Sequence, residues 1–518
     1  MKRWLCYLVP LCLVAALAAG WSFRLLRADG PPAAWEAVPR APRIRPDYTD
    51  TVLPPNIAPL NFAVEEPGAA YRVRLHAAQG PGIEIASAGP TIEIPLQPWR
   101  TLLAQNRGGR LEIDVYAQDP AGRWNRFETI TNRIADEPID SHLVYRLLGA
   151  VFTNWGHLGI YQRNLETFEE TPILRNTAFK GGCVNCHSFP AGRPEHFSLH
   201  VRPPGSRPFA GGMLAVHDGQ AVRIATKSAA LPRLPTYTSW HPTAPLAATS
   251  LTRAEQFLHG AGVEVREVYD LESDLALIDV RTGAISSPPA LADPERLETF
   301  PGWSADGRYL YFCSASQPQR APTQPPNAGY ESVRHDLMRI RYDVDRGTWG
   351  PLESVLAAAK TGRSINEPRV SPDGRWLLFC MTDHGAFPVL QADSDLYLMD
   401  LAKDGEFPYR PLTRANSTES DSWHCWSSNS RWIVFSSKRG SGLFARPQIC
   451  YVDSEGREHK PFVLPQQDPR FYDSYLKTYN VPELVRGPVK IAEEALVQAI
   501  LAAPGSQANQ TLPPSGVP

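Results

Sequence analysis

Apolar and polar residues alternate with a period of two between residues 48 and 137. The alternation is clearest over residues 71–76, 91–96 and 111–116, and turn residues such as Gly108-Gly109 separate the runs. Short alternating runs bounded by glycine and proline are typical of half-buried β-strands. The pattern therefore predicts a small β-sandwich of immunoglobulin or fibronectin type over residues 48–137.

A repeating strand–turn–strand unit begins at about residue 211. Clear copies start at Trp303, Val370 and Trp426, a degenerate copy starts at Trp240, and successive copies lie 56–67 residues apart. Asp-Gly or Asn-Ser pairs supply the turns, because these residues tolerate left-handed backbone angles. A further strand follows each copy, so that one repeat predicts a four-stranded propeller blade. Residues 211–465 are predicted to form a β-propeller of about five or six blades, the last closed by segments outside the repeat.

Residues 138–210 follow neither pattern. A short helix is predicted over residues 143–148, and bulky apolar residues follow it. The segment contains Cys183-Val184-Asn185-Cys186-His187, which reads C-x-x-C-H, the attachment sequence for a c-type haem. Zinc knuckles and redox disulfides also use C-x-x-C, but the chain has no other copy, and the flanking glycines and proline predict a loop. The mainly β chain is thus predicted to carry one covalent haem c on a short insert that neighbouring domains cover.

His187 is the predicted proximal ligand of the haem iron. Four side chains are candidates for the opposite face of the iron: His157, His196, His200 and Met213. We favour His200 because its apolar neighbours could carry it onto the haem, and an open iron site is a further alternative. The choice matters because the second axial ligand decides the reduction potential and whether the iron can bind another ligand. Arg202 could pair with a haem propionate, although a solvated arginine is an equally plain interpretation.

The N-terminus predicts export. Met1-Lys2-Arg3 precedes an uncharged run of 18 residues from Trp4 to Trp21, a length between that of a signal peptide and that of a spanning helix. We interpret residues 1–29 as a signal or, slightly better, an uncleaved membrane anchor. Covalent haem attachment takes place outside the bacterial cytoplasm, so both features place the chain on the periplasmic side of the cytoplasmic membrane, anchored or secreted.

The remaining segments are assigned from composition. Residues 30–47 are proline-rich and predict a linker, and residues 466–502 predict a packing segment with an amphipathic stretch over 489–501. Residues 503–518 predict a disordered tail. Across the 518 residues, 43% are hydrophobic and 20% charged, and the net charge of −2 gives no nucleic-acid footprint. Four further cysteines are predicted to be buried small apolar residues rather than disulfides: Cys313, Cys380, Cys425 and Cys450.

The repeat resembles the TolB-like or PD40 β-propeller repeat, and Ser371-Pro372-Asp373-Gly374-Arg375 fits its central run. The order of parts over residues 46–483 is also similar to that of bacterial envelope proteins with a PD40 propeller behind one C-x-x-C-H insert. Stretches like residues 53–62 and 160–165 occur in them, and a His-x-Arg like that of His200 and Arg202 tends to follow the motif. The resemblance implies the architecture and the haem, and little about a substrate.

Together these observations predict an exported monohaem cytochrome that passes single electrons and docks an unknown redox or envelope partner through its propeller. Alternatives are an interaction module with a structural or sensing haem, and a haem enzyme with an open iron site. Six polar residues on loops entering the inner strands could converge on the channel mouth: Glu298, Thr299, Asn366, Glu367, Asp421 and His424. The plainer interpretation of these six is ordinary solvated loops. No hydrolase or phosphate-binding motif of the common types is present.

Overall fold

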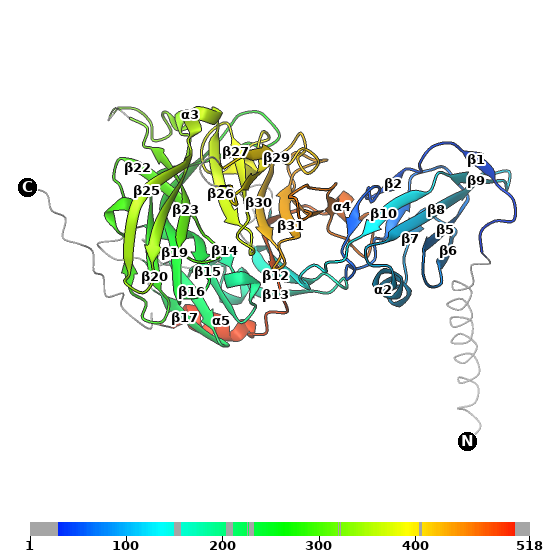
Figure 1. Ribbon diagram of the computed structural model, residues 1–518, viewed down its shortest axis with the longest axis horizontal. Coiled ribbons are helices and arrows are strands. Elements are labelled where there is room, and N and C mark those ends of the chain that lie inside the picture. Colours follow the sequence, from blue (N-terminus) through cyan, green and yellow to red (C-terminus); the bar gives the residue numbers. More distant parts are fainter. Residues whose placement is uncertain are drawn as a thin grey trace, which may run out of the picture. The chain divides into compact units, whose positions relative to one another are not determined.

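The computed structural model describes residues 30–149, 157–203, 211–224, 226, 233–319, 321, 323–403 and 407–502. The anchor predicted over residues 1–29 and the tail predicted over 503–518 lie outside these residues. The described chain is mainly β, as predicted, and divides into two compact units (Figure 1). Within these described ranges, no helix is both long enough and apolar enough to cross a membrane.

The first unit comprises residues 30–138, Glu166–Phe168 and Pro465–Tyr475. Its larger sheet runs β1 (Glu36–Val38), β9 (Trp124–Phe127), β8 (Arg110–Gln118), β10 (Ile130–Ile134) and β3 (Val52–Leu53), with β5 (Ala70–Ala77) pairing β8 and β6 (Ile83–Ser87). Its smaller sheet runs β2 (Ile44–Arg45), β4 (Phe62–Val64) and β7 (Thr91–Ile92). It also contains helices α2 (Leu96–Gln105) and α4 (Phe471–Ser474). The alternating runs over 71–76 and 111–116 are confirmed as parts of β5 and β8. The immunoglobulin or fibronectin type stays a prediction.

Two predictions for this unit were wrong. The strand expected over residues 91–96 ends at Ile92, and α2 begins at Leu96 and buries Trp99, Leu102 and Leu103. Those three residues recur at helical spacing, and the alternation before them hid this signal. The linker expected over residues 30–47 is instead packed on the unit. It contributes β1 and β2, and Arg40 Nη2 lies 2.6 Å from Glu66 Oε2.

Glu66 explains why the proline-rich segment is held in place. Its side chain is buried, and hydrogen bonds from Arg40 and from the backbone N–H of Arg43 satisfy both carboxylate oxygens. The hydrogen bond from Arg40 lowers the pKa of Glu66 to about 2, against the opposing effect of burial. A buried carboxylate needs such partners, so residues 40–43 are fixed to the sheet rather than free to swing.

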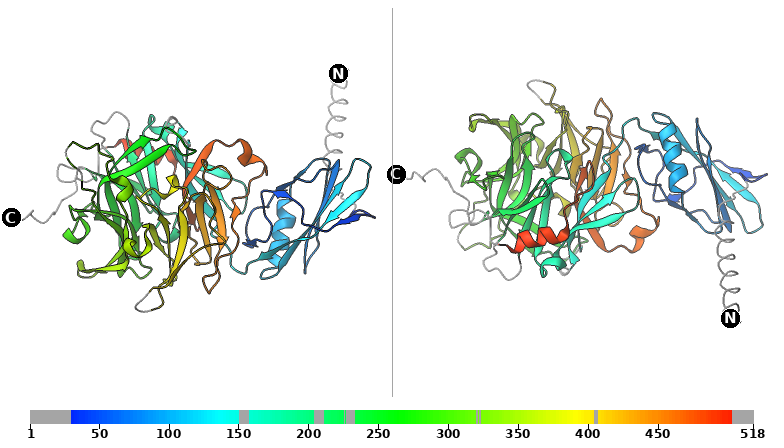
Figure 2. Two further views of the ribbon diagram at one scale, coloured as in Figure 1. Left: turned by 90° about the horizontal axis from the view of Figure 1, so that it is seen from above. Right: turned by 90° about the horizontal axis from the view of Figure 1, so that it is seen from below.

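The second unit consists of four four-stranded sheets and one eight-stranded sheet (Figures 1 and 2). A single parallel pair, Ser273 and Leu297, joins the two halves of the larger sheet, so the unit has six groups of four strands. In chain order, five of them run from inner to outer strand as follows: β14 (Cys183–Ser188), β15 (His196–Arg202), β16 (Gly212–His217), β17 (Gln220–Ile224); β18 (Leu234–Trp240), β19 (Leu246–Leu258), β20 (Arg266–Asp279), β21 (Ile285–Ser286); β22 (Arg296–Trp303), β23 (Tyr309–Ser316), β24 (Asp336–Asp343), β25 (Thr348–Leu356); β26 (Ser364–Val370), β27 (Trp376–Thr382), β28 (Asp395–Asp400), β29 (Tyr409–Pro411); β30 (Asp421–Trp426), β31 (Trp432–Ser437), β32 (Arg446–Tyr451), β33 (Phe462–Val463). The sixth runs β34 (Lys477–Val485), β11 (His142–Gly149), β12 (Gly159–Asn164) and β13 (Glu170–Arg175).

The inner strands form a closed ring. β34 contacts β14, and contacts continue through β18, β22, β26 and β30 back to β34. Six groups of four strands around such a ring are the blades of a six-bladed β-propeller, within the predicted range of five or six. The last blade joins the C-terminal β34 to β11, an antiparallel pair that brings His142 opposite Val485. Closure by a segment outside the repeat is therefore confirmed.

The interpretation of residues 138–210 as a separate insert differs from the structure. The helix predicted over 143–148 is β11, whose residues Leu143, Val144 and Tyr145 are fully buried. A strand covered on both faces gives a continuous apolar run, which periodicity cannot distinguish from a helix. The haem motif likewise lies on β14 rather than on a loop. The propeller thus begins at β11 instead of residue 211 and ends at β34 instead of residue 465.

Helix α5 (Glu493–Leu501) covers one side of the propeller beside β13, β16 and β17 (Figure 2, right). Leu496 and Ile500 are fully buried in an apolar cluster that also contains Val184 of the haem motif. The amphipathic stretch is confirmed as a helix with a later start. Other short helices are α3 (Ala358–Thr361) and the 3-10 turns Asn176–Phe179, Pro190–Gly192, Pro289–Leu291, Tyr330–Ser332 and Pro388–Leu390.

Ring closure depends on the contact between β34 and β11, so a cavity at that contact should weaken the whole propeller. Tyr479 on β34 is 1% exposed, and its ring centroid lies 4.8 Å from that of Tyr145 on β11. We expect Tyr479→Ala to lower the free energy of unfolding by about 3–5 kcal/mol, as other large-to-small core substitutions do. Chemical denaturation measures this change. The matched control is Leu352→Ala on β25, where the side chain is 47% exposed and the change should stay within about 0.5 kcal/mol.

Candidate functional site

All six inner strands lose regular pairing at the same level of the ring. Register shifts occur between Asn185 and Ser188, Pro235 and Thr238, Thr299 and Gly302, Asn366 and Arg369, and Ser422 and Cys425, and opposite β34 between Val144 and Arg146. Five of the strands place a non-glycine residue at positive φ there: Cys186 (29°), Phe300 (51°), Glu367 (57°), Trp423 (48°) and Val481 (48°). Such angles are uncommon for these residue types, and bulges that carry them re-aim side chains, often at functional sites.

The bulges surround a central cavity of about 510 Å³, including its open mouth. Every inner strand contributes to its wall. The polar residues of the wall are Cys186, His187, Thr238, Glu367, Arg369, His424 and Glu483. The sequence placed four of these in the channel region or the haem motif without bringing them together. The cavity joins the C-x-x-C-H strand to Glu367 and His424.

Aromatic side chains fill the channel at one end of this cavity. The ring centroids of Tyr237 and Phe300 lie 4.2 Å apart, and those of Tyr237 and Trp423 lie 5.4 Å apart. Tyr237 and Trp423 come from β18 and β30, which are on opposite sides of the ring of strands. Their contact therefore closes the channel at this level and gives the cavity an apolar floor.

His187 is the most unusual polar residue of the wall. It is 2% exposed, and neither ring nitrogen makes a well-formed hydrogen bond within the described structure, although the backbone of Val144 and of Val481 lies near enough to act as a weak acceptor. Burial lowers the pKa of His187 to about 3, and the positive charges of Arg146 and Arg369 act in the same direction. The imidazole is therefore neutral at pH 7 and keeps a free lone pair, which is the form that binds a metal.

The two motif cysteines differ in their surroundings. Cys186 is buried at the cavity wall, and burial raises the pKa of its thiol to about 12. Cys183 is half-buried at the start of β14, opposite Arg202 on β15. Neither Cys183 nor Arg202 is among the lining residues of the cavity. The structure thus brings one motif cysteine and the motif histidine into the cavity and leaves the other cysteine beside it.

The predicted distal ligands lie elsewhere in the fold. His200 is buried on β15, and its Nε2 lies 2.9 Å from Thr238 Oγ1. Met213 is buried opposite His200 on β16, and His196 lies 3.6 Å from Asp218 at the outer end of the hairpin. His157 is exposed. None of these four lines the central cavity, and the distal assignment stays a prediction.

Glu367 and His424 form part of the cavity wall, and a cysteine lies behind them. Glu367 Oε2 accepts a hydrogen bond of 2.7 Å from the backbone N–H of Trp423, whereas Glu367 Oε1 has no partner. Burial raises the pKa of Glu367 to about 8. His424 Nδ1 and Cys380 Sγ lie 3.8 Å and 3.7 Å from Glu367 Oε2. A solvated-loop interpretation of Glu367 and His424 does not fit, because they are 5% and 3% exposed.

A buried ion pair completes the polar side of the wall. Arg369 Nη2 lies 3.0 Å from Glu483 Oε1, and these residues come from β26 and β34. Glu483 is 6% exposed, and its burial raises its pKa although Arg369 opposes the effect. Arg369 therefore supplies a positive charge at the cavity and links the closing strand to the rest of the ring.

A second, smaller cavity of about 310 Å³ lies beside Leu297, near the start of β22. Asp270, His335 and His384 line it with several apolar residues. Asp270 is 6% exposed, and neither of its carboxylate oxygens has a hydrogen-bond partner in the described structure. Burial raises the pKa of Asp270 to about 7. This carboxyl group is therefore protonated below neutral pH.

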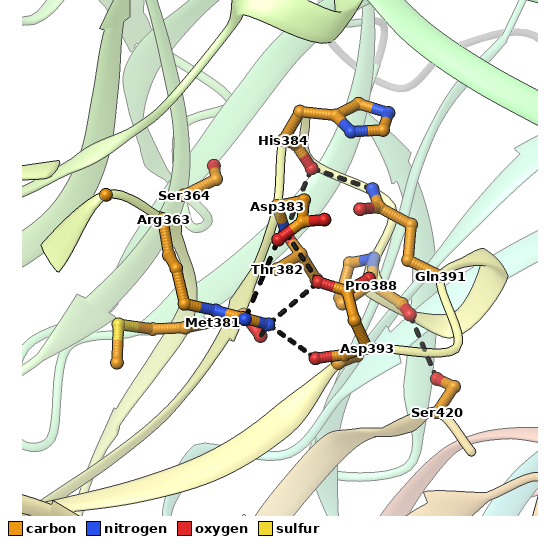
Figure 3. Close-up of polar contacts among 12 residues, drawn as sticks. Arg363, Ser364, Met381, Thr382, Asp383, His384, Pro388, Gln391, Asp393 and Ser420 are labelled. Atoms are coloured by element: carbon orange, nitrogen blue, oxygen red, sulfur yellow. Dashed lines mark hydrogen bonds and ion pairs between the residues drawn. The ribbon is translucent and has the colours of Figure 1, made fainter. Parts of the chain in front are cut away.

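An arginine holds the loop that forms one wall of this second cavity (Figure 3). Arg363 Nη2 donates to Asp393 Oδ2 over 2.7 Å, and the same carboxylate oxygen accepts the backbone N–H of Asp383 over 2.7 Å. Gln391 Nε2 donates to the carbonyl of His384 over 2.7 Å. These bonds fix the loop between β27 and β28 and with it the position of the His384 ring.

A fixed spacing in the sequence marks the bulged positions. The prediction did not use this spacing. Phe300, Glu367 and Trp423 each stand three residues before the first residue of a repeat copy. Tyr237 likewise stands three residues before Trp240, the first residue of the degenerate copy. Cys186 stands three residues before another aromatic residue, Phe189. The haem motif could thus have been placed on an inner strand. Cys380 could not have been found, because it reads as an ordinary buried residue after Phe379.

No protein-family model and no curated protein sequence matches the chain. Among solved structures, a puromycin-hydrolysing peptidase from Mycobacterium tuberculosis is similar over 54% of this chain, at 13% identity and a TM-score of 0.33, and this chain spans 38% of that peptidase. The β-propeller domain of the Trilobed protease from Pyrococcus furiosus is similar over 69% of this chain and 95% of its own, at 11% identity and a TM-score of 0.31. An oligogalacturonate lyase from Vibrio parahaemolyticus is similar over 67% of this chain and 87% of its own, at 10% identity and a TM-score of 0.30.

The function predicted from the sequence, single-electron transfer by a monohaem cytochrome, is contradicted by these comparisons. The structures of similar fold are named as a peptidase, the propeller of a protease and a lyase, and none of the three names describes a haem protein. Electron transfer is therefore not proposed for this chain.

Asp270 gives a pH-dependent prediction. Because its pKa is raised in the folded chain, the folded state binds more protons than the unfolded state between about pH 4 and pH 7, and stability contributed by this group falls as pH rises through that window. Asp270→Asn should remove the effect. We expect the variant to match the parent protein near pH 4 and to exceed it by at least about 1 kcal/mol at pH 8.

Denaturant unfolding of both proteins at several pH values measures this difference. The control is Asp345→Asn, at an exposed turn position, whose difference from the parent should stay flat with pH. A flat difference for Asp270→Asn as well would show that the buried carboxyl group does not titrate as described.

Proposed function

We propose that the chain binds one haem c covalently at the central cavity of its propeller. Cys183 and Cys186 carry the two thioether bonds, and His187 is the axial ligand of the iron. The proposal concerns cofactor binding and includes no electron transfer. When bound, the haem supplies an iron centre whose ligand binding and potential depend on the second axial ligand.

The observation that carries the proposal is the state of His187. Its imidazole is buried and neutral, and no well-formed hydrogen bond holds either ring nitrogen in the described structure. A buried polar group without a partner costs about 1–3 kcal/mol, so proteins rarely keep one without a use. Iron coordination gives this imidazole a partner, and Cys186 stands beside it in the C-x-x-C-H order that haem attachment needs.

The cavity wall also suits a porphyrin. Tyr237, Phe300 and Trp423 offer aromatic faces, which exclude water from the apolar macrocycle. Arg369 lines the cavity, and Arg202 lies opposite Cys183 on the neighbouring strand. Guanidinium groups pair with carboxylates such as haem propionates. Arg202 as a propionate partner and His200 as the distal ligand remain parts of the proposal.

Haem c attachment supports the expected location of the chain. The attachment reaction belongs to the periplasmic side of the bacterial cytoplasmic membrane, and the apolar run within residues 1–29 fits export or anchoring there. A protein partner in the envelope that binds the propeller stays a prediction, as does membrane contact through the N-terminal segment. The net charge of −2 supports no nucleic-acid partner.

The test is to produce the full chain in a bacterial host that attaches haem c. We expect the purified protein to gain the mass of one haem, to keep it through denaturing electrophoresis, and to show a c-type absorption spectrum. The double variant Cys183→Ala/Cys186→Ala should lose the adduct completely. His187→Ala should alter the spectrum through the lost axial ligand, and His200→Ala should do so only if His200 occupies the distal position.

The matched control is Cys450→Ser, which changes a fully buried cysteine outside the motif and should keep the haem. A parent chain without haem, from a host that loads a reference cytochrome c at the same time, would overturn the proposal. Haem retained by the double cysteine variant would overturn the assigned attachment. Circular dichroism confirms that each variant is folded.

A further inference from the structure

Three buried ligand-type side chains from two adjacent blades meet at the wall of the central cavity. They are Glu367 on β26, Cys380 on β27 and His424 on β30, and one ligand atom from each lies within 4.8 Å of the others. Their exposed fractions are 5%, 0% and 3%. The haem proposal uses none of them. We propose that these three side chains bind one transition-metal ion of the zinc class, with the fourth coordination position open to the cavity.

The hydrogen bonds around His424 leave one nitrogen ready for a metal. His424 Nε2 lies 3.1 Å from the carbonyl oxygen of Leu378, so Nε2 carries the proton and donates it to that carbonyl. Nδ1 then keeps its lone pair, and it makes no well-formed hydrogen bond in the described structure, with Glu367 Oε2 3.8 Å away. Metal-binding histidines usually donate their second ring N–H to a carbonyl or carboxylate in this way, which fixes the tautomer and the ring orientation.

A hydrogen bond also orients the Glu367 carboxylate for metal binding. Its Oε2 accepts the backbone N–H of Trp423, which orients the carboxylate, and its Oε1 is buried without a partner. Hydrogen bonds to a ligating carboxylate are a common feature of metal sites. The positive φ of 57° at Glu367 aims this side chain toward the cluster from a strand that otherwise pairs regularly.

The spacing of the donors fits a tetrahedral ion. Glu367 Oε2 lies 3.7 Å from Cys380 Sγ and 3.8 Å from His424 Nδ1. Donors bonded to one tetrahedral zinc ion lie about 3.4–3.6 Å apart, from the usual bond lengths to sulfur, nitrogen and oxygen. The ligand atoms of Cys380 and His424 lie within 4.8 Å of each other, so the side chains must move closer together to bind one ion.

The atom types and the charge of the three ligands favour zinc over magnesium and calcium. One sulfur, one imidazole nitrogen and one carboxylate oxygen suit zinc, whereas magnesium and calcium prefer sites made of oxygen alone. A thiolate and a carboxylate together neutralise a divalent cation. The occupied site then holds no net charge, which suits its burial.

The open position follows from where the three residues lie. Glu367 and His424 line the cavity, whereas Cys380 stands behind them in the apolar cluster between two blades. Three protein ligands with a fourth position for water or substrate are typical of zinc sites that do chemistry, where the metal makes its bound water more acidic.

The test uses the full chain, loaded with zinc ions and then dialysed against metal-free buffer. Elemental analysis counts zinc separately from haem iron, and X-ray absorption at the zinc edge identifies the bonded atoms. We expect about one zinc per chain with one sulfur ligand. Cys380→Ser and Glu367→Gln should each weaken zinc binding at least about tenfold and abolish the rise in melting temperature that zinc gives the parent.

Two controls separate this site from others. Cys450→Ser alters an equally buried cysteine of the same apolar cluster and should bind zinc like the parent. The double variant Cys183→Ala/Cys186→Ala should also keep its zinc, so that failure of the haem proposal leaves this one intact. A second group, His196, His217 and Asp218, is partly exposed and contains no cysteine, so zinc bound there would show no sulfur.

A parent chain that retains no zinc would overturn the proposal. So would a zinc spectrum without sulfur, or equal zinc binding by the parent and a folded Cys380→Ser variant. In the first case the three residues would form only a protonated hydrogen-bonded cluster.

Discussion

The pairing of β34 with β11 is the constraint on which the propeller depends. It joins strands that are more than three hundred residues apart, and it supplies one complete blade from both sides of the repeat region. The inner strands β14 and β30 each have two neighbours in the ring only when this blade is in place. The central cavity depends on it too, because Val481, Pro482 and Glu483 of β34 form part of its wall.

Within the ring, the bulged inner strands concentrate polar chemistry in an apolar interior. A regular strand would point alternate side chains between the blades and into the channel. Positive backbone angles at Cys186, Glu367 and Trp423 break that alternation at one level of the channel. The residues with positive backbone angles therefore lie at or next to buried polar groups that lack a hydrogen-bond partner in the described structure. A scaffold with six blades can hold such strain because tightly packed outer strands surround every inner strand.

The sequence predicted the parts of the fold that follow local rules. The Asp-Gly turns and flanking aromatic residues identified the hairpins at Trp303, Val370 and Trp426, and the count of blades followed from their spacing. β11 was mistaken for a helix because burial on both faces removes alternation. β34 carries no repeat motif, so its sequence did not show that it belongs to a propeller blade. Cys380 joins Glu367 and His424 only through packing between blades, which no spacing rule along the chain reveals.

The order of strands also has a consequence for how the chain matures. β14, which carries Cys186 and His187, lies next to β34 in the ring, and β34 comes near the end of the chain. Until β34 docks, the ring has a gap beside the motif. Docking of β34 then buries both residues. Any enzyme that modifies them has its widest access to the incomplete ring, so the docking of β34 sets the time available for modification.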